Sequence, residues 1–370
     1  MVVEQIVLSN FRCYQQYAIN FDGRSAVITG PNGAGKTSIL EALHILAITK
    51  SFLPVDDSEL IRHSSSTYRI ESTVLHDGGS TIKIAIEYTK GIGKSVYTSI
   101  TDSCSAQELI GLVPCVVLAS LHKELFYGEP AVRRAFVDRI LSQYSLSYKS
   151  ALWRYRIALK QRNRLLQEGG SATNAELDAW TVELVKTSVE LLWQRKHFVE
   201  LFNQELSLIA ASIAPPSVEP MLQYTIPWLP SECQPNTWGS FKDNLFTIIA
   251  NHSTAMLATD SMRQSTQWGP QRDIFTFATE THPLYTVLSQ GQLKIMLFAI
   301  KITEATILHQ QTGRAPILLL DDVFSDLDKQ NTASIQESVA KYSAKWQFFI
   351  TAPSSIEILD PMSTFMHIQL

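Results

Sequence analysis

The sequence of 370 residues predicts an α/β protein with a mixed central sheet, an antiparallel β subdomain and an inserted helical domain. Near the N-terminus, an apolar run, a glycine-rich loop and a helical pattern follow one another, as in nucleotide-binding sheets. Alternating apolar and polar residues over 67–101, interrupted by the turn residues Asp77-Gly78-Gly79, predict antiparallel strands. Residues 129–212 are helical in pattern, and α/β character returns after them.

The composition describes an ordinary globular protein and excludes several classes. Apolar residues make up 45% and charged residues 18% of the chain, which is unlike a disordered protein. The formal net charge of −4 means that any nucleic-acid binding must come from a local patch. No apolar run approaches the roughly 18 residues of a membrane-spanning helix, and the N-terminus reads as a strand rather than a signal peptide. We expect a cytoplasmic protein with no membrane contact and with reduced, buried thiols. The cysteines, which lack C-x-x-C spacing, are Cys13, Cys104, Cys115 and Cys233.

The glycine-rich loop is the strongest functional signal. It follows the apolar run Ala26–Ile28, precedes a helical pattern over Ser38–Leu46, and has the GxxxxGK[ST] spacing of a P-loop. Its glycines let successive N–H groups point into one concavity that suits an anion, and the positive helix end adds to that field. We expect Lys36 to reach the β- and γ-phosphates of a nucleotide and Thr37 to bind Mg²⁺. The loop consists of Gly30, Pro31, Asn32, Gly33, Ala34, Gly35, Lys36 and Thr37.

A buried strand that ends in two carboxylates would complete this site. The apolar run Ile317–Leu320 is followed by Asp321 and Asp322. In a nucleotide-binding sheet, Asp321 would hold Mg²⁺ through water, and Asp322 would orient or deprotonate the attacking water. A strand that ends in a polar turn is common by itself, but the presence of a P-loop favours the functional interpretation.

A second phosphate-binding device precedes this strand. The segment Leu288–Gln292 opens a helical pattern over Leu293–Leu308. A hydroxyl, backbone N–H groups and a positive helix end can hold a phosphate, although a simple helix N-cap explains the same residues. One chain cannot easily bring both devices onto one γ-phosphate, so the second would act across a homodimer. Its residues are Ser289, Gly291 and Gln292.

Two groups of basic residues are candidates for DNA binding. The segment Lys149–Arg164 has no acidic residue, and three of its basic residues form a stripe at helical spacing. Such a stripe can track a phosphate backbone without sequence preference, whereas a solvated helix face would look the same. Arg133 and Arg134 form the second group, for which pairing with Asp138 and Glu129 is the alternative. The stripe consists of Arg156, Lys160 and Arg164.

The set and order of these motifs resemble those of the ABC-type ATPases, and further segments resemble the RecF family of recombination and repair proteins. The resemblance covers nearly the whole chain and implies an ABC-type P-loop ATPase head with an inserted helical arm. It also implies that Arg12 belongs to the nucleotide-binding residues. The segments that carry it are Leu8–Tyr14, Gly128–Asp138, Trp268–Asp273, Leu288–Gln292 and Leu318–Asp328.

The chain departs from the family pattern at two places. Ala119–Lys123 lacks the expected Pro-Glu or Pro-Asp, and Gly269–Ile274 has Gln271 and Ile274 where the family usually has His and Asp. The first departure implies altered coupling between ATP and conformational change.

By resemblance, residues 1–125 and 266–370 form the two parts of the ATPase domain, and residues 126–265 form the helical insertion. The same resemblance implies ATP and Mg²⁺ as ligands, ATP-dependent homodimerisation on duplex DNA or single-strand junctions, and weak, DNA-stimulated hydrolysis. In the family, RecO and RecR are partners in recombinase loading. The alternatives are another SMC-like ATPase, for example in phage defence, and a P-loop kinase. The kinase fits poorly, because it has no use for a second phosphate device.

Overall fold

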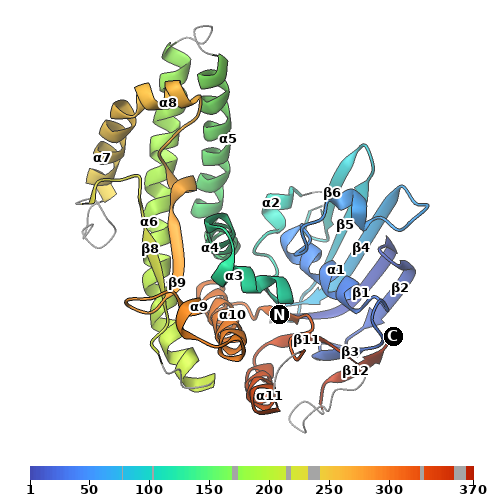
Figure 1. Cartoon of the computed structure of the whole chain (residues 1–370). Helices are drawn as coiled ribbons and strands as arrows, with labels where there is room; N and C mark the ends of the chain where they lie inside the picture. Colours follow the sequence, from blue (N-terminus) through green and yellow to red (C-terminus); the bar gives the residue numbers. More distant parts are fainter. Residues whose placement is uncertain are drawn as a thin grey trace. The chain divides into compact units, whose positions relative to one another are not determined.

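The computed structural model describes residues 1–76, 78–101, 104–168, 174–213, 218–231, 242–325, 329–353 and 364–370 (Figure 1). The chain forms two compact units. Unit 1 contains Met1–Lys123, Leu208–Pro216 and Ser289–Leu370, and unit 2 contains Glu124–Ser207 and Ser217–Leu288. The expected division at 265/266 therefore differs from these units, since residues 266–288 belong to unit 2.

The central sheet of unit 1 has the strand order β12-β3-β11-β10-β7, and all four neighbouring pairs are parallel. The central sheet is therefore parallel where a mixed sheet was expected, and the antiparallel strand pairs of unit 1 lie in its second sheet. Every residue of β7, β10 and β11 is buried, as expected for a parallel sheet covered on both faces. The strands are β3 (Ala26–Thr29), β7 (Cys115–Leu118), β10 (Ile317–Leu320), β11 (Gln347–Ala352) and β12 (Met366–Gln369).

The second sheet of unit 1 is antiparallel and has the order β2-β1-β4-β5-β6. Alternate residues of β4 are buried, which confirms the period of two in the sequence. Strands β4 and β5 pair from Leu75 opposite Thr81, on either side of the expected turn, in which Asp77 lies outside the described residues. The strands are β1 (Val2–Phe11), β2 (Tyr14–Asn20), β4 (Thr67–Leu75), β5 (Thr81–Thr89) and β6 (Gly93–Thr98).

Helix α1 (Lys36–Ile48) packs between the two sheets, because it contacts β4 and β5 of one and β7, β10 and β11 of the other. Its apolar residues belong to one buried cluster with side chains from both sheets. The side chain of Gln347 joins the sheets directly: it accepts from Val3 N (2.7 Å) and donates to Val3 O (2.9 Å). The remaining helices of unit 1 are η1 (Asp57–Leu60), α2 (Ala106–Leu109), η2 (Ser120–Lys123), α10 (Gln290–Thr312) and α11 (Lys329–Ser343).

Unit 2 is built around two long antiparallel helices, α5 (Leu146–Glu168) and the part of α6 (Asn174–Ile213) up to Ser207, which lie side by side in Figure 1. Arg154 pairs with Glu183 at 2.7 Å, and Arg162 Nε donates to Thr181 Oγ1 at 2.9 Å. The helical character expected for residues 129–212 is confirmed, while residues 169–173 between the two helices lie outside the described residues. The other elements are α3 (Glu124–Tyr127), α4 (Pro130–Tyr144), β8 (Met221–Thr225), α7 (Lys242–Ala255), α8 (Leu257–Arg263), η6 (Pro270–Arg272), β9 (Ile274–Ala278) and α9 (Leu284–Val287).

A buried polar network centred on Arg195 holds unit 2 together. Arg195 donates to Asp138 Oδ1 (2.8 Å), Asp273 Oδ2 (2.5 Å) and Pro270 O (2.8 Å). Asp273 also accepts from Trp228 Nε1 (2.9 Å) and from the Tyr224 hydroxyl (2.8 Å). The two segments that most resemble the RecF family, 128–138 and 268–273, therefore meet in the interior of unit 2. Since β9 pairs with β8 beside this network, residues 266–288 fold with the helices.

We expect Arg195→Met to lower the free energy of unfolding of unit 2 by about 3–5 kcal/mol, because Asp138 and Asp273 would keep buried, uncompensated charges. Arg164→Met is the matched control. The side chain of Arg164 is 58% exposed and contacts Glu168 and Gln161 of its own helix, so its loss should cost less than about 0.5 kcal/mol. Urea unfolding followed by tryptophan fluorescence compares the two, and equal stabilities would show that the network is not a stabilising core.

Candidate functional site

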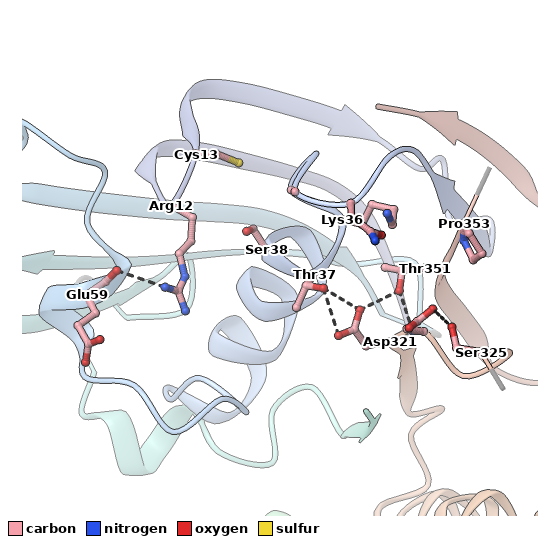
Figure 2. Close-up of a pocket in the computed structure, with 14 residues that line it drawn as sticks. Arg12, Cys13, Lys36, Thr37, Ser38, Glu59, Asp321, Ser325, Thr351 and Pro353 are labelled. Atoms are coloured by element: carbon pink, nitrogen blue, oxygen red, sulfur yellow. Dashed lines mark hydrogen bonds between the residues drawn. The ribbon is translucent and has the colours of Figure 1, made fainter. Parts of the chain in front are cut away.

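Three parallel strands bring the predicted residues to one edge of the central sheet. Strand β11 lies between β3 and β10, with Ile350 opposite Leu320 and Ala352 opposite Thr29. The carboxyl ends of these strands meet at the edge where α/β proteins bind ligands. An open cleft of about 800 Å³ lies there. The predicted residues that line it are Arg12, Asn32, Gly33, Gly35, Lys36, Thr37, Asp321 and Asp322 (Figure 2).

The glycine-rich loop adopts a conformation that needs glycine at Gly35. Its φ of 101° lies in the left-handed region, where a side chain is strained. A Cβ atom there would also lie 2.6 Å from the Tyr14 hydroxyl and 2.8 Å from Cys13 Sγ. Lys36 begins α1 and turns back over the loop, with Nζ 2.7 Å from Gly30 O. The loop therefore places an ammonium group and the positive end of a helix of 13 residues at one wall of the cleft.

The carboxylates after β10 are held by hydroxyl groups from two other segments. Thr37 Oγ1 lies 3.0 and 3.2 Å from the two oxygens of Asp321, and Thr351 Oγ1 donates to Asp321 Oδ1 at 2.8 Å (Figure 2). Asp322 N–H donates to Thr351 Oγ1 at 2.9 Å, and the Ser325 hydroxyl donates to Asp322 Oδ1. The loop, the two acids and the end of β11 thus form one connected set.

Burial raises the pKa of Asp321 above its ordinary value. The hydrogen bonds from Thr351 and Thr37 oppose this effect, the charge of Asp322 adds to it, and the charge of Lys36 opposes it. A half-buried carboxylate beside a hydroxyl is a donor set of hard oxygens, which suits Mg²⁺. Thr37 and Asp321 therefore fit a magnesium ion, as the sequence predicts.

Arg12 reaches the cleft from the turn between β1 and β2 and is held by Glu41 of α1. Its Nε and Nη2 donate to the two carboxylate oxygens of Glu41, each at 2.8 Å. The Ser51 hydroxyl donates to the same carboxylate at 2.5 Å, and Glu41 is only 1% exposed. The geometry therefore fixes the direction of the Arg12 guanidinium at the wall of the cleft.

The second predicted phosphate device is not part of this cleft. Ser289 caps α10: its side chain accepts from Gln292 N, and Gln292 Oε1 accepts from Ser289 N at 2.8 Å. Ser289 and Gln292 are exposed, and Gly291 lies close to α11, where a Cβ atom would be 3.3 Å from Asn331 Nδ2. The described residues that line the cleft include none of the three. Asp326–Asp328, in the segment after the acids, lies outside the described residues.

The two groups of basic residues differ in their exposure and in their hydrogen-bond partners. Arg133 is 9% exposed and donates to Phe275 O (2.5 Å) and Gly128 O (2.8 Å), and Arg134 donates to Asp273 O (2.9 Å). Burial lowers the pKa of both guanidinium groups. These two arginines therefore donate to backbone carbonyls of unit 2, which neither the candidate role in DNA binding nor the alternative of pairing with Asp138 and Glu129 had included.

The helical stripe on α5 has more exposed members. The side chain of Arg156 is 66% exposed and lies 3.6 Å from Asp138, and that of Arg164 is 58% exposed and pairs with Glu168 at 2.8 Å. Lys160 is exposed as well. Weak ion pairs of this kind on a surface leave the charges accessible to a polyanion.

Sequence reasoning missed Thr351, Glu41 and Ser325. Thr351 follows the apolar run Gln347–Ile350, so a polar residue at the end of a buried strand was the available signal. Glu41 lies one turn after Thr37 in an otherwise apolar stretch of α1, where a carboxylate requires a partner. Nothing local in the sequence singles out Ser325.

The segment 119–123, which departs from the family pattern, contains η2 (Ser120–Lys123). Within it, Ala119 N–H donates to His122 Nδ1 at 2.9 Å.

Comparisons with known proteins agree with this geometry. A family model described as RecF/RecN/SMC N terminal domain matches residues 2–369. The DNA replication and repair protein RecF of Chloroherpeton thalassium is 32% identical, over 95% of this chain and 94% of that protein. RecF of Geobacillus kaustophilus is 30% identical, over 96% of this chain and 93% of that protein.

Two solved structures share the fold. A structure of the recombination mediator protein RecF with ATP superposes with a TM-score of 0.86 at 24% identity, covering 96% of this chain and 93% of that one. An SMC head bound to a domain of ScpA gives a TM-score of 0.54 at 12% identity, covering 98% and 91% of the two chains. These likenesses confirm the predicted fold class, an ABC-type ATPase head with a helical insertion.

Replacing Asp321 by Asn should stabilise the nucleotide-free protein. Burial raises the pKa of Asp321, so the folded protein holds this proton more tightly than the unfolded chain, and the carboxylate costs more stability as the pH rises. The gain over the unmodified protein should therefore be larger at about pH 8 than at about pH 5 in thermal unfolding.

Asp322→Asn is the control, because Asp322 is exposed and its replacement should change stability by less than about 0.5 kcal/mol. A gain for Asp321→Asn that does not grow with pH would contradict the role assigned to burial.

Proposed function

Because this chain belongs to the RecF family of DNA replication and repair proteins, we propose that it is an ATPase that binds DNA as an ATP-dependent homodimer. The observation that carries the proposal is the connected set of Thr37, Asp321 and Thr351 beside the P-loop, in a cleft of about 800 Å³. Such a set suits the positioning of phosphates, a cation and a water, which is the main work of phosphoryl transfer.

The residues of the cleft that the sequence predicts have distinct roles in this proposal. The backbone of Gly30–Thr37 and the ammonium of Lys36 bind the phosphates, and Arg12 adds a fixed positive charge at the wall. Thr37 and Asp321 would hold Mg²⁺, which neutralises phosphate charge when bound. Asp322, exposed beside Asp321, would orient the attacking water and accept its proton.

The homodimer follows from the position of the second phosphate device. Ser289, Gly291 and Gln292 begin a helix of 23 residues, so their end of it carries a positive dipole. Ser289 and Gln292 are exposed, and the described residues that line the cleft include neither of them nor Gly291. This supports a role for the three residues in binding the nucleotide of a second copy. ATP would then be a ligand shared by two protomers.

DNA binding is proposed for the exposed stripe Arg156, Lys160 and Arg164 of α5. Arg133 and Arg134 are left out, because their guanidinium groups bond to backbone carbonyls. With a net charge of −4, the chain needs such a local patch for a polyanion. Duplex DNA and duplexes near single-strand junctions are the proposed substrates.

Slow, DNA-stimulated hydrolysis and a place in recombinase loading with RecO and RecR complete the proposal. They follow from family membership, and a solved relative is described as a recombination mediator in the RecFOR pathway. The alternative of a phage-defence ATPase keeps the same cleft with another purpose. No described helix is long and apolar enough to cross a lipid bilayer.

Ser289→Arg should abolish ATP-dependent dimerisation while leaving ATP binding intact, because it disrupts only the trans contact. Lys36→Arg should also abolish dimerisation, because it disturbs the binding of the phosphates within the same protomer. The control is Gln311→Arg, an exposed position in the last turn of the same helix, where a cation is tolerated. Light scattering with and without ATP measures the dimer, and a Ser289→Arg protein that still dimerises would remove the shared-nucleotide arrangement.

Replacing Arg156, Lys160 and Arg164 together by Gln should weaken DNA binding and flatten its salt dependence. If each contacts one phosphate, the slope of log K against log salt concentration falls by about 3. Fluorescence anisotropy with a labelled duplex gives this slope. A matched set of exposed cations in unit 1, Arg24, Lys83 and Lys90 changed to Gln, should leave it unaltered. Equal slopes in the two sets would assign the stripe to a solvated face.

A further inference from the structure

We propose that Thr351 is a positioning residue for hydrolysis, because its hydroxyl fixes the Asp321 carboxylate and the Asp322 backbone at the same time. The inference rests on the proposed ATPase function. It assigns a role to a residue outside the P-loop and outside the strand that carries the acids.

The strand order puts Thr351 where it can act on both sides of the cleft. Strand β11 separates the strand that leads into the P-loop from the strand that leads to the acids. Thr351 lies opposite Ile28 of β3 and one residue beyond Ile350, which lies opposite Leu320. Its side chain lines the cleft beside Asp321 (Figure 2), although the residue as a whole is only 1% exposed.

The Thr351 hydroxyl is both a hydrogen-bond donor and a hydrogen-bond acceptor. It donates its one proton to Asp321 Oδ1 at 2.8 Å and accepts from Asp322 N–H at 2.9 Å. A hydroxyl offers one donor and two acceptor positions, so one group can restrain the metal-binding acid and the next residue together. Hydrogen bonds to ionised groups are stronger than neutral ones, and the first of these bonds is of that kind.

Asp322 needs such a restraint because its backbone is strained. Its φ is 53°, in the left-handed region that residues with a side chain avoid. Strained residues at functional sites persist when the surrounding structure holds them. Here Thr351 holds the N–H, and Ser325 holds the carboxylate. The direction in which Asp322 faces the cleft therefore depends on Thr351.

Thr37 holds the same carboxylate from the other side, with its hydroxyl 3.0 Å from Asp321 Oδ1. If Thr37 gives an oxygen lone pair to a cation, its proton can still point to Asp321, so the two hydroxyls restrain the carboxylate together. Thr351 differs from Thr37 in that its hydroxyl also accepts the Asp322 N–H, and so it links the two acids.

The test compares Thr351→Val, which keeps the shape and removes the hydroxyl, with Thr351→Ser, which keeps the hydroxyl. For Thr351→Val we expect kcat for ATP hydrolysis to fall about 10- to 100-fold, the effect of losing a hydrogen bond to a charged group, with KM within about threefold. Thr351→Ser should recover kcat to within about threefold. A second readout is the binding of a non-hydrolysable ATP analogue: the affinity gained on adding Mg²⁺ should shrink in Thr351→Val and return in Thr351→Ser.

Analogue binding without Mg²⁺ shows that each variant is folded, and Thr351→Ala replaces Thr351→Val if the valine protein does not fold. An unchanged kcat in the variant without a hydroxyl would overturn the proposal. A serine variant as slow as the valine variant would also overturn it, because the methyl group would then matter. If the unmodified protein fails to bind or hydrolyse ATP, the proposed function itself fails and this inference goes with it.

Discussion

The parallel register of β3, β11 and β10 is the constraint on which the site depends. These strands are staggered so that the P-loop, Thr351 and Asp321 emerge at the same edge. A slip of one residue in a strand would turn its side chains to the opposite face. Gln347 opposes such a slip in β11, because it is hydrogen-bonded to both the N–H and the carbonyl of Val3 in the other sheet. The relative positions of the residues in the cleft are therefore set by the register of the central sheet.

Helix α1 links this edge to the rest of unit 1. Its first turn faces the cleft through Lys36 and Thr37, and its next turn carries Glu41, which holds Arg12 from the antiparallel sheet. Because α1 packs against both sheets, a displacement of either sheet would shift α1 and the glycine-rich loop that precedes it. One helix thus begins in the glycine-rich loop, places the Thr37 hydroxyl beside Asp321 and supports Arg12.

The parts of this fold that are encoded locally could be predicted from the sequence. The P-loop spacing, the apolar run before Asp321 and the alternation in β4 each identify their element within a few residues. The short strand β12 has a weak pattern and is not among the elements that the sequence predicts, and neither is the break between α7 and α8. Thr351 and Glu41 could not be assigned roles, since their partners lie 30 and 29 residues away in the chain and meet them only through the strand order. The hydrogen bonds of Arg133 and Arg134 could not be predicted for the same reason, because their acceptors include carbonyls of β9 and of the residue before it.

Those two arginines show how a count of charges can mislead a mutational scan. A survey of basic residues would place Arg133 and Arg134 beside Arg156 as equal candidates. Replacing Arg133 by alanine would leave the carbonyls of Phe275 and Gly128 without their donor in the interior, and unit 2 would be damaged as a whole. Under the proposed DNA binding, the resulting loss of affinity would resemble the loss of a phosphate contact, yet the salt dependence would be unchanged. The salt dependence of the remaining affinity would then separate a cation that contacts DNA from one that supports the fold.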